Sequence, residues 1–182
     1  MTIWTDLPVH NWGATAAECE RPQPCDRFLS NPDDTLFRAI DIAAPPAIAF
    51  HWLCQLRAAP YSYDWIDNLG RQSPLTLTPG LEQLAIGQRV MGVFRLVDFK
   101  PDRHLTILLD SSRAALFLGQ VAITYAVSPA RRQSRLLVKL LVRYPRGLLG
   151  MAMRCTLPAS DLIMMRKQLL NLKHLAETTP LI

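Results

Sequence analysis

The order of the predicted elements constrains the fold of this chain more than any single motif does. One strand comes first, short helices follow, a run of strands comes next, and a long amphipathic helix closes the chain. The first strand is predicted over about 35–42 and ends before Pro45-Pro46, and the first helix is predicted over about 47–56. Because the apolar stripe of the closing helix must be buried, a sheet wrapped on that helix would form a container.

The closing helix is predicted from the spacing of its apolar residues. We expect it to begin near Ser160, whose hydroxyl can cap the first turn. Apolar side chains then recur every three or four positions, at Leu162, Met165, Leu169, Leu172 and Ala176. This spacing gathers them on one face, which we expect to pack on the sheet.

The middle of the chain reads as a second short helix, a loop and a meander. The second helix is predicted over about 61–70, and residues 71–88 form a loop punctuated by Pro and Gly. We interpret this loop as a candidate lid, because loops of that length commonly cover an opening or carry function. Strands are predicted over about 89–99, 104–110, 119–127 and 135–144, and their alternation indicates an antiparallel sheet with one packed face.

The length of 182 residues is typical of one domain. Residues 1–34 show no helical or strand period, so we expect an extended N-terminal arm that packs on the domain through Trp4 and Trp12. Residues 35–182 are expected to form a single domain.

Composition excludes several classes of function. Twenty Lys and Arg against fifteen Asp and Glu give a charge of +5, but the basic residues are scattered, so no nucleic-acid partner is expected. The longest uncharged runs fall short of the ~18 apolar residues that cross a bilayer, so we expect no stable membrane insertion. The N-terminus lacks the basic and apolar regions of a secretory leader, so a cytoplasmic location is expected.

The cysteines predict neither a metal site nor a disulfide framework. Cys19, Cys25, Cys54 and Cys155 form no CxxC pair, and free thiols are favoured in a chain with a core of this size. The alternatives are a Cys19–Cys25 disulfide or a zinc site that includes His10. No glycine-rich phosphate loop is present, and we expect no cofactor.

Short motifs along most of the chain resemble a known family. Those motifs are Trp12-Gly-Ala-Thr15, Pro24-Cys25-Asp26 (with Cys where Gly is usual), Ile40–Pro45 followed by Phe50–Leu53, Tyr61-Ser-Tyr-Asp64, Ile86–Val90 (with Gln88 where Asp is usual), Arg135-Leu136, and Met165–Leu169 followed by Ala176-Glu177. In these motifs the chain resembles the START/Bet v 1-like (SRPBCC) superfamily, in its bacterial polyketide cyclase/dehydrase and lipid-transport-like branch.

The resemblance implies an α+β helix-grip fold. In that fold a curved antiparallel sheet of about seven strands wraps a long C-terminal helix, two short helices follow the first strand, and an elongated apolar cavity lies between sheet and helix. The residue pattern alone supplies five or six strands. One short strand is therefore expected between Leu75 and Arg89, or split from the segment 88–99.

Six residues are candidates to contact a ligand in such a cavity. Arg95 and Tyr125 lie on strands that could direct a polar tip inward, and Tyr61 and Tyr63 lie where this fold places the cavity mouth. Trp52 and Met165 complete the set, because aromatic rings and flexible thioethers suit an apolar ligand. The alternatives are an ion pair with an aspartate for Arg95, core packing for Tyr125, and a structural clasp for the tyrosines at the mouth. No catalytic residue is assigned.

Three functions are open at this stage. The first is binding, and possibly transport, of a hydrophobic small molecule or lipid. The second is a cyclase or dehydratase acting on a polyketide-like or aromatic substrate, which requires a polar cluster deep in the cavity. The third is a partner-binding module with a collapsed cavity, whose interior is filled by Trp52, Phe94, Leu140 and Met165.

Overall fold

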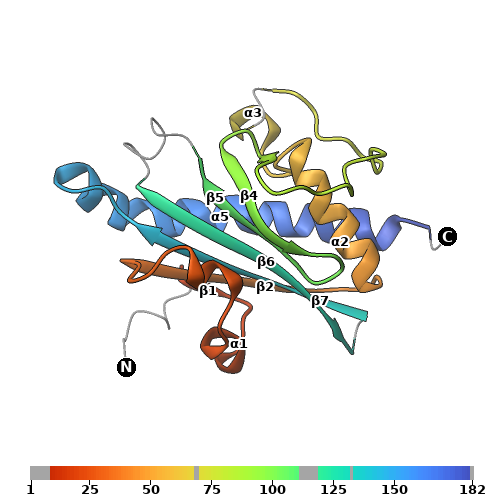
Figure 1. Ribbon diagram of the computed structural model, residues 1–182, viewed down its shortest axis with the longest axis horizontal. Helices are drawn as coiled ribbons and strands as arrows, with labels where there is room; N and C mark the ends of the chain where they lie inside the picture. Colours follow the sequence, from red (N-terminus) through yellow and green to blue (C-terminus); the bar gives the residue numbers. More distant parts are fainter. Residues whose placement is uncertain (1–8, 68–69, 111–118, 132, 181–182) are drawn as a thin grey trace.

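A single curved sheet wraps the C-terminal helix in the computed structural model, which describes residues 9–67, 70–110, 119–131 and 133–180 (Figure 1). Within those residues the sheet has seven strands in the order β1-β2-β7-β6-β5-β4-β3. Only β1 pairs in parallel, with β2; the other pairs are antiparallel. The strands are β1 (Asn11–Trp12), β2 (Asp34–Ile42), β3 (Arg89–Val90), β4 (Phe94–Lys100), β5 (His104–Leu109), β6 (Gln120–Ala130) and β7 (Gln133–Arg143).

The helices complete the helix-grip architecture expected from the sequence. The long helix α5 lies along the sheet, and α2 crosses near its C-terminal half (Figure 1). The helical elements of the described residues are α1 (Ala16–Glu20), η2 (Pro24–Arg27), α2 (Pro46–Cys54), η3 (Gln55–Arg57), α3 (Asp64–Asp67) and α5 (Leu148–Thr178). The predicted fold class and the two short helices after the first long strand are therefore confirmed.

The two strands that alternation alone did not resolve are both short. Residues 89–99 divide into β3 and β4, because Met91 and Gly92 both adopt positive φ values and turn the chain between them. This is one of the two places where the missing strand was expected. The other short strand, β1, lies in the segment predicted to be an extended arm, which also contains α1 and η2. Trp4 lies outside the described residues.

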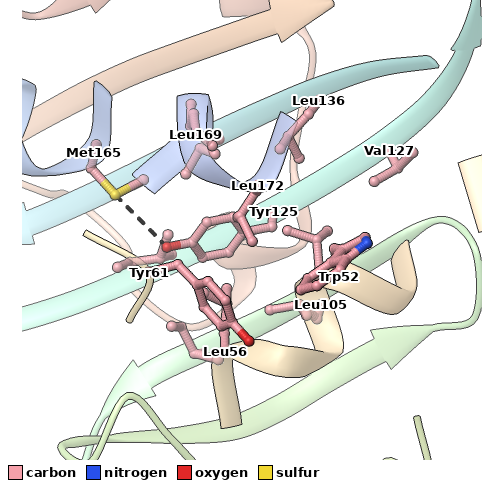
Figure 2. Close-up of a cluster of buried hydrophobic side chains, with 14 of the residues drawn as sticks. Trp52, Leu56, Tyr61, Leu105, Tyr125, Val127, Leu136, Met165, Leu169 and Leu172 are labelled. Carbon is pink, nitrogen blue, oxygen red and sulfur yellow. Dashed lines mark hydrogen bonds between the residues drawn. The ribbon is translucent and has the colours of Figure 1, made fainter. Parts of the chain in front are cut away.

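The concave face of the sheet carries the main core. Along β7 the residues Leu136, Val138, Leu140 and Val142 join this core, whereas Leu137 and Leu141 between them face smaller clusters on the other side. Alternate residues of a strand point to opposite faces, so this pattern follows directly from the sequence. Figure 2 shows how residues from the α2–η3 segment, the sheet and α5 meet in this core.

The closing helix is longer than the sequence predicted. Helix α5 begins at Leu148, about three turns before Ser160, and it continues through Pro158. A proline inside a helix removes one backbone hydrogen bond and usually ends or kinks the helix, yet Pro158 lies within α5. Ser160 therefore does not cap the helix; its hydroxyl donates to the Leu157 carbonyl at 3.1 Å.

The predicted apolar face of α5 is largely confirmed. Met165, Leu169, Leu172 and Ala176 are buried against the concave face, and Leu162 is half-buried. Among the described helices, α5 alone is long and apolar enough to cross a membrane by length and composition. Its C-terminal half packs in the core of the domain.

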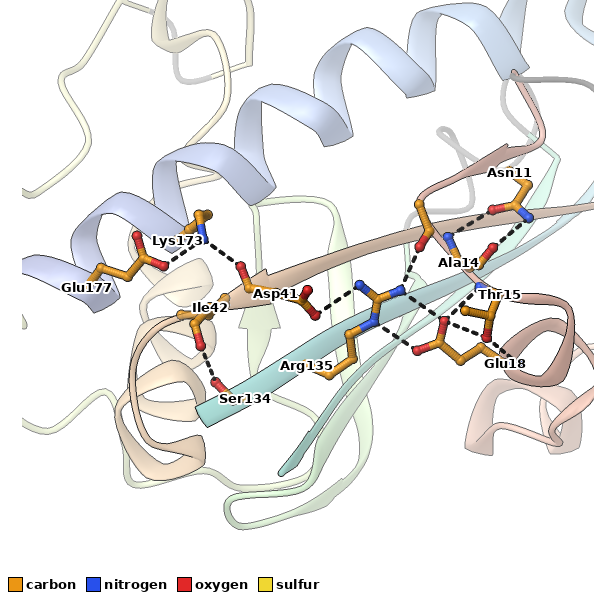
Figure 3. A network of polar contacts seen from close by, with 11 residues as sticks. Asn11, Ala14, Thr15, Glu18, Asp41, Ile42, Ser134, Arg135, Lys173 and Glu177 are labelled. Carbon is orange, nitrogen blue, oxygen red and sulfur yellow. Dashed lines mark hydrogen bonds and ion pairs between the residues drawn. The ribbon is translucent and has the colours of Figure 1, made fainter. Parts of the chain in front are cut away.

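After β1, which forms an edge of the sheet, the N-terminal segment with α1 and η2 packs on the convex face. The Cys25 amide donates to the Thr124 hydroxyl at 2.9 Å, and Lys139 forms an ion pair with Asp26 at 2.7 Å. Arg135 is the centre of a second set of contacts, drawn in Figure 3, and it binds both oxygens of Glu18 at 2.9 and 3.0 Å. The segment is thus fixed to β6 and β7 by polar contacts.

Candidate functional site

A cavity of about 610 Å³ lies between the concave face of the sheet and α5. Twelve of its lining residues are apolar: Pro60, Ile66, Met91, Val93, Phe94, Val121, Ile123, Leu140, Val142, Leu157, Met164 and Met165. Val121 and Ile123 of β6 and Leu140 and Val142 of β7 occupy alternate positions of their strands, which is why they share one wall. The cavity is therefore mostly apolar, and two methionines of α5 contribute adaptable side chains.

The cavity reaches the surface between α3, the turn before β4, and α5. Ile66 and Val93 line it and are 50% and 43% exposed, and Ser160 of α5 is also exposed. Lining residues that are exposed mark the place where solvent or a ligand can enter. The mouth therefore lies beside the short helix α3.

One buried polar pair crosses the cavity wall. The Tyr125 hydroxyl donates to Gln168 Oε1 at 2.9 Å, and Gln168 Nε2 donates to the Pro60 carbonyl at 2.7 Å. Met165 Sδ lies 3.8 Å from the same hydroxyl, the contact that Figure 2 draws as a dashed line. Burial raises the pKa of Tyr125, so its phenol stays protonated and acts as a neutral hydrogen-bond donor.

A charged pair lies at another part of the wall. Asp161 lines the cavity and accepts from Arg38 Nη2 at 2.8 Å, and the Arg38 side chain is only 1% exposed. Arg38 also donates to the carbonyls of Phe37, Val9 and Pro158. Burial raises the pKa of Asp161 to about 6, although Arg38 opposes this change, and burial lowers the pKa of Arg38.

Two of the six predicted site residues line the cavity. These are Tyr125 and Met165, which come from β6 and α5. Trp52 is buried beside them in the core, and its Nε1 donates to the Thr179 hydroxyl at 2.8 Å. The ring of Tyr61 meets the Trp52 ring edge-on at 6.0 Å between centroids. Tyr61 lines a separate hollow of about 170 Å³.

Tyr63 and Arg95 lie away from the cavity. Tyr63 borders a surface hollow of about 260 Å³ on the outer side of α5. Arg95 forms an ion pair with Asp110 at 2.5 Å and has a half-exposed side chain, which was the alternative open for it. The structure thus gathers Tyr125 and Met165 and leaves the other four candidates outside the wall.

The loop 71–88 does not line the cavity either. Gln55 holds it through both atoms of its amide, since Nε2 donates to the Thr78 carbonyl and Oε1 accepts from the Thr78 amide. Arg57 donates to the carbonyls of Leu81 and Gln83. These contacts fix the loop on η3, and the segment that contributes to the mouth is Ile66 with Met91–Phe94 instead.

The sequence analysis missed Gln168 and Asp161 as cavity residues. Gln168 was detectable, because it falls three positions after Met165 on the apolar stripe of the closing helix, where a polar residue is unusual. Asp161 gave no such signal. Its partner Arg38 is 123 positions away in the sequence.

The described residues contain no group of three His, Cys, Asp or Glu side chains that could hold a metal ion. All four cysteines are free: Cys25 and Cys54 are buried, Cys19 is half-buried and Cys155 is exposed. Burial raises the pKa of the Cys54 thiol to about 12, so it is a poor nucleophile.

Comparison with known proteins identifies the class of fold. No family model and no curated protein sequence matches the chain. Several solved structures do match. Protein MLL2253 from Mesorhizobium loti has a TM-score of 0.51 at 15% identity, over 81% of this chain and 99% of that one. Hypothetical protein jhp0584 from Helicobacter pylori has a TM-score of 0.54 at 12% identity, over 85% and 95%.

A third match is the di-domain ARO/CYC StfQ from the steffimycin biosynthetic pathway. Its TM-score is 0.50 at 12% identity, over 79% of this chain and 50% of that one. At these identities the likeness concerns the fold alone. The chain has a helix-grip fold, with a seven-stranded sheet wrapped on a long C-terminal helix, and these solved structures share that fold.

Proposed function

We propose that the protein binds a hydrophobic small molecule or lipid in the cavity between the sheet and α5. The observation that carries this proposal is the cavity itself, because about 610 Å³ lies within the range of small-molecule sites and twelve of its lining residues are apolar. A chain that used its fold only for packing would gain stability by filling such a space. The volume also argues against a module with a collapsed cavity, since Phe94, Leu140 and Met165 line the space rather than close it.

A cyclase or dehydratase is the second candidate, and one observation favours it. Asp161 lines the cavity with a pKa raised to about 6, which is the range a general acid or base needs at neutral pH. The Tyr125 phenol on the same wall could hydrogen bond a carbonyl if it left Gln168. This candidate predicts turnover, whereas binding alone predicts that the ligand is released unchanged.

The first test is mass spectrometry of organic extracts from gently purified protein, with heat-denatured protein as the control. A ligand that co-purifies at stoichiometric amounts would support the proposal and name its class. If no apolar compound is retained, and fatty acids, sterols and aromatic polyketides also leave the melting temperature unchanged, the binding proposal is wrong.

A matched pair of variants locates the site. Val121 lines the cavity and Gln120 is exposed on the opposite face of β6, so Val121→Trp fills the space while Gln120→Trp adds the same ring outside. We expect Val121→Trp to lose the retained ligand and Gln120→Trp to keep it. Equal retention by both variants would place the ligand elsewhere.

Incubating the released compound with fresh protein, and looking for a new mass, tests the enzymatic candidate. Cytoplasmic location stays a prediction.

A further inference from the structure

Each polar side-chain donor on the described cavity wall already donates a hydrogen bond within the protein. The hydroxyls of Ser62 and Ser160 donate to carbonyls of α5 at 3.0 and 3.1 Å. The Tyr125 hydroxyl donates to Gln168, and Gln168 Nε2 donates to the Pro60 carbonyl and to Met91 Sδ. A ligand in the cavity therefore meets no spare side-chain donor among the described wall residues. The unpartnered Arg38 Nε does not line the cavity.

The same wall offers unused acceptors. Asp161 Oδ2 accepts from Arg38, whereas Oδ1 has no hydrogen-bond partner among the described residues. The hydroxyl oxygens of Tyr125 and the two serines each keep a lone pair, because a hydroxyl that donates can still accept. Of these acceptors the carboxylate is the strongest, since hydrogen bonds to charged groups are about twice as strong as neutral ones.

The charge of the ligand narrows the class of molecules that the cavity can bind. A carboxylate ligand would place its oxygens against acceptors and meet no spare side-chain donor, so its buried negative charge would have no partner. An ammonium ligand would meet a carboxylate that Arg38 already neutralises, and it would leave one buried positive charge without a partner. A neutral hydroxyl satisfies the free oxygen and adds no charge.

We infer that the cavity selects neutral apolar molecules that carry a hydroxyl group, an alcohol or a phenol, and that this hydroxyl donates to Asp161. The inference rests on the proposed binding function and specifies its ligand class. The hydroxyl is the recognised group, and the apolar wall accepts the rest of the molecule with little demand on its shape.

The test compares four ligands with the same ten-carbon chain at pH 8, by displacement of the neutral dye Nile red. The ligands are 1-decanol, decyl methyl ether, decanoate and decylamine. A hydrogen bond to a charged acceptor corresponds to roughly a tenfold gain in affinity. We therefore expect decanol to bind about ten times more tightly than the ether, which accepts but cannot donate, and more tightly than both charged ligands.

Two variants assign the acceptor. Asp161→Asn removes the charge at similar size, and we expect the decanol-to-ether ratio to fall to about two. Asp64→Asn makes the same change on a carboxylate that holds Ser73 outside the cavity, and we expect it to keep the wild-type ratio. Ether binding by each variant shows that its cavity is intact.

The outcomes separate the two proposals. If decanol and the ether bind equally well to the wild-type protein, or if decanoate binds best, the hydroxyl inference is overturned and the binding function stands. If none of the four ligands displaces the dye and the dye itself does not bind, the binding function fails and the inference fails with it.

Discussion

Replacing Glu18 by Gln tests how the N-terminal segment is fixed to the sheet. Glu18 binds Arg135 through both carboxylate oxygens and also accepts from the Thr15 amide at 2.8 Å, forming the capping box of α1. Glutamine can still serve the capping box, so Glu18→Gln removes mainly the ion pair. Arg135 is the hub of these contacts, because it also donates to the Gly13 carbonyl at 2.6 Å (Figure 3).

The magnitude follows from the pKa of Glu18, which the hydrogen bonds from Arg135, together with those from Thr15, lower from 4.5 to about 2. Such a change corresponds to roughly 3 kcal/mol, and solvent screening of this surface pair reduces the expected loss to about 1–2 kcal/mol. For a chain of this length that loss lowers the melting temperature by about 2–8 °C at pH 7.

The pH dependence gives the sharper test. Because the folded-state pKa is lowered, the contribution of Glu18 is fully present above pH 4.5 and is lost as the pH falls toward 2. Urea unfolding should therefore separate wild-type protein from Glu18→Gln at pH 7 and bring them together near pH 2. Glu20→Gln is the control, because Glu20 is exposed on the same helix. A difference that is unchanged at low pH, or equal in the control, would refute this reasoning.

Three further predictions concern stability. Gly13 has φ +82°, and a Cβ there would overlap a carbonyl oxygen of β2. Gly13→Ala should therefore lower the free energy of unfolding, measured in urea, by about 2–4 kcal/mol. Gly92→Ala, at φ +73° in open space, should lower it by about 1 kcal/mol. Leu169 is fully buried, so Leu169→Ala should cost about 2–5 kcal/mol while Leu170→Ala, on the exposed side, costs under about 0.5. The Asp161 pKa is raised from 3.8 to about 6, so its contribution favours folding below pH 4 and is lost as the pH rises through 6; Asp161→Asn should flatten that part of the stability profile.

Local patterns predicted the main elements, because each has a period of its own, and the family resemblance supplied the helix-grip arrangement of those elements. Alternation along residues 104–110 and 119–127 marked the central strands, and the three-and-four spacing after Ser160 marked the helix that they grip. Prediction failed where tertiary contacts override a local signal. Ser160 suggested the start of the closing helix, yet the helix begins at Leu148 and passes through Pro158, whose carbonyl accepts from Arg38 of β2. The two-residue strand β1 is too short to show any period.

The candidate site was less predictable, because its wall depends on which way side chains point. Tyr125 was found from its place on a strand, whereas Arg95 has a similar sequence context but pairs with Asp110 at the surface. Both residues lie on strands with mixed faces, and one sequence does not decide which face is concave. The pairing of Arg38 with Asp161 is a contact between distant segments, and no local pattern contains it.

The Arg38–Asp161 pair carries the desolvation cost of a buried ion pair. Burial raises the pKa of Asp161 and lowers that of Arg38, so both groups are less stable as ions here than in water. Two apolar residues of similar volume would commonly stabilise such a position instead, and Arg38 would no longer need its carbonyl acceptors on β2, the N-terminal segment and α5. That replacement would also remove the one carboxylate from the described cavity wall. The carboxylate that makes the pair costly is thus the same group that we expect a ligand hydroxyl to bind.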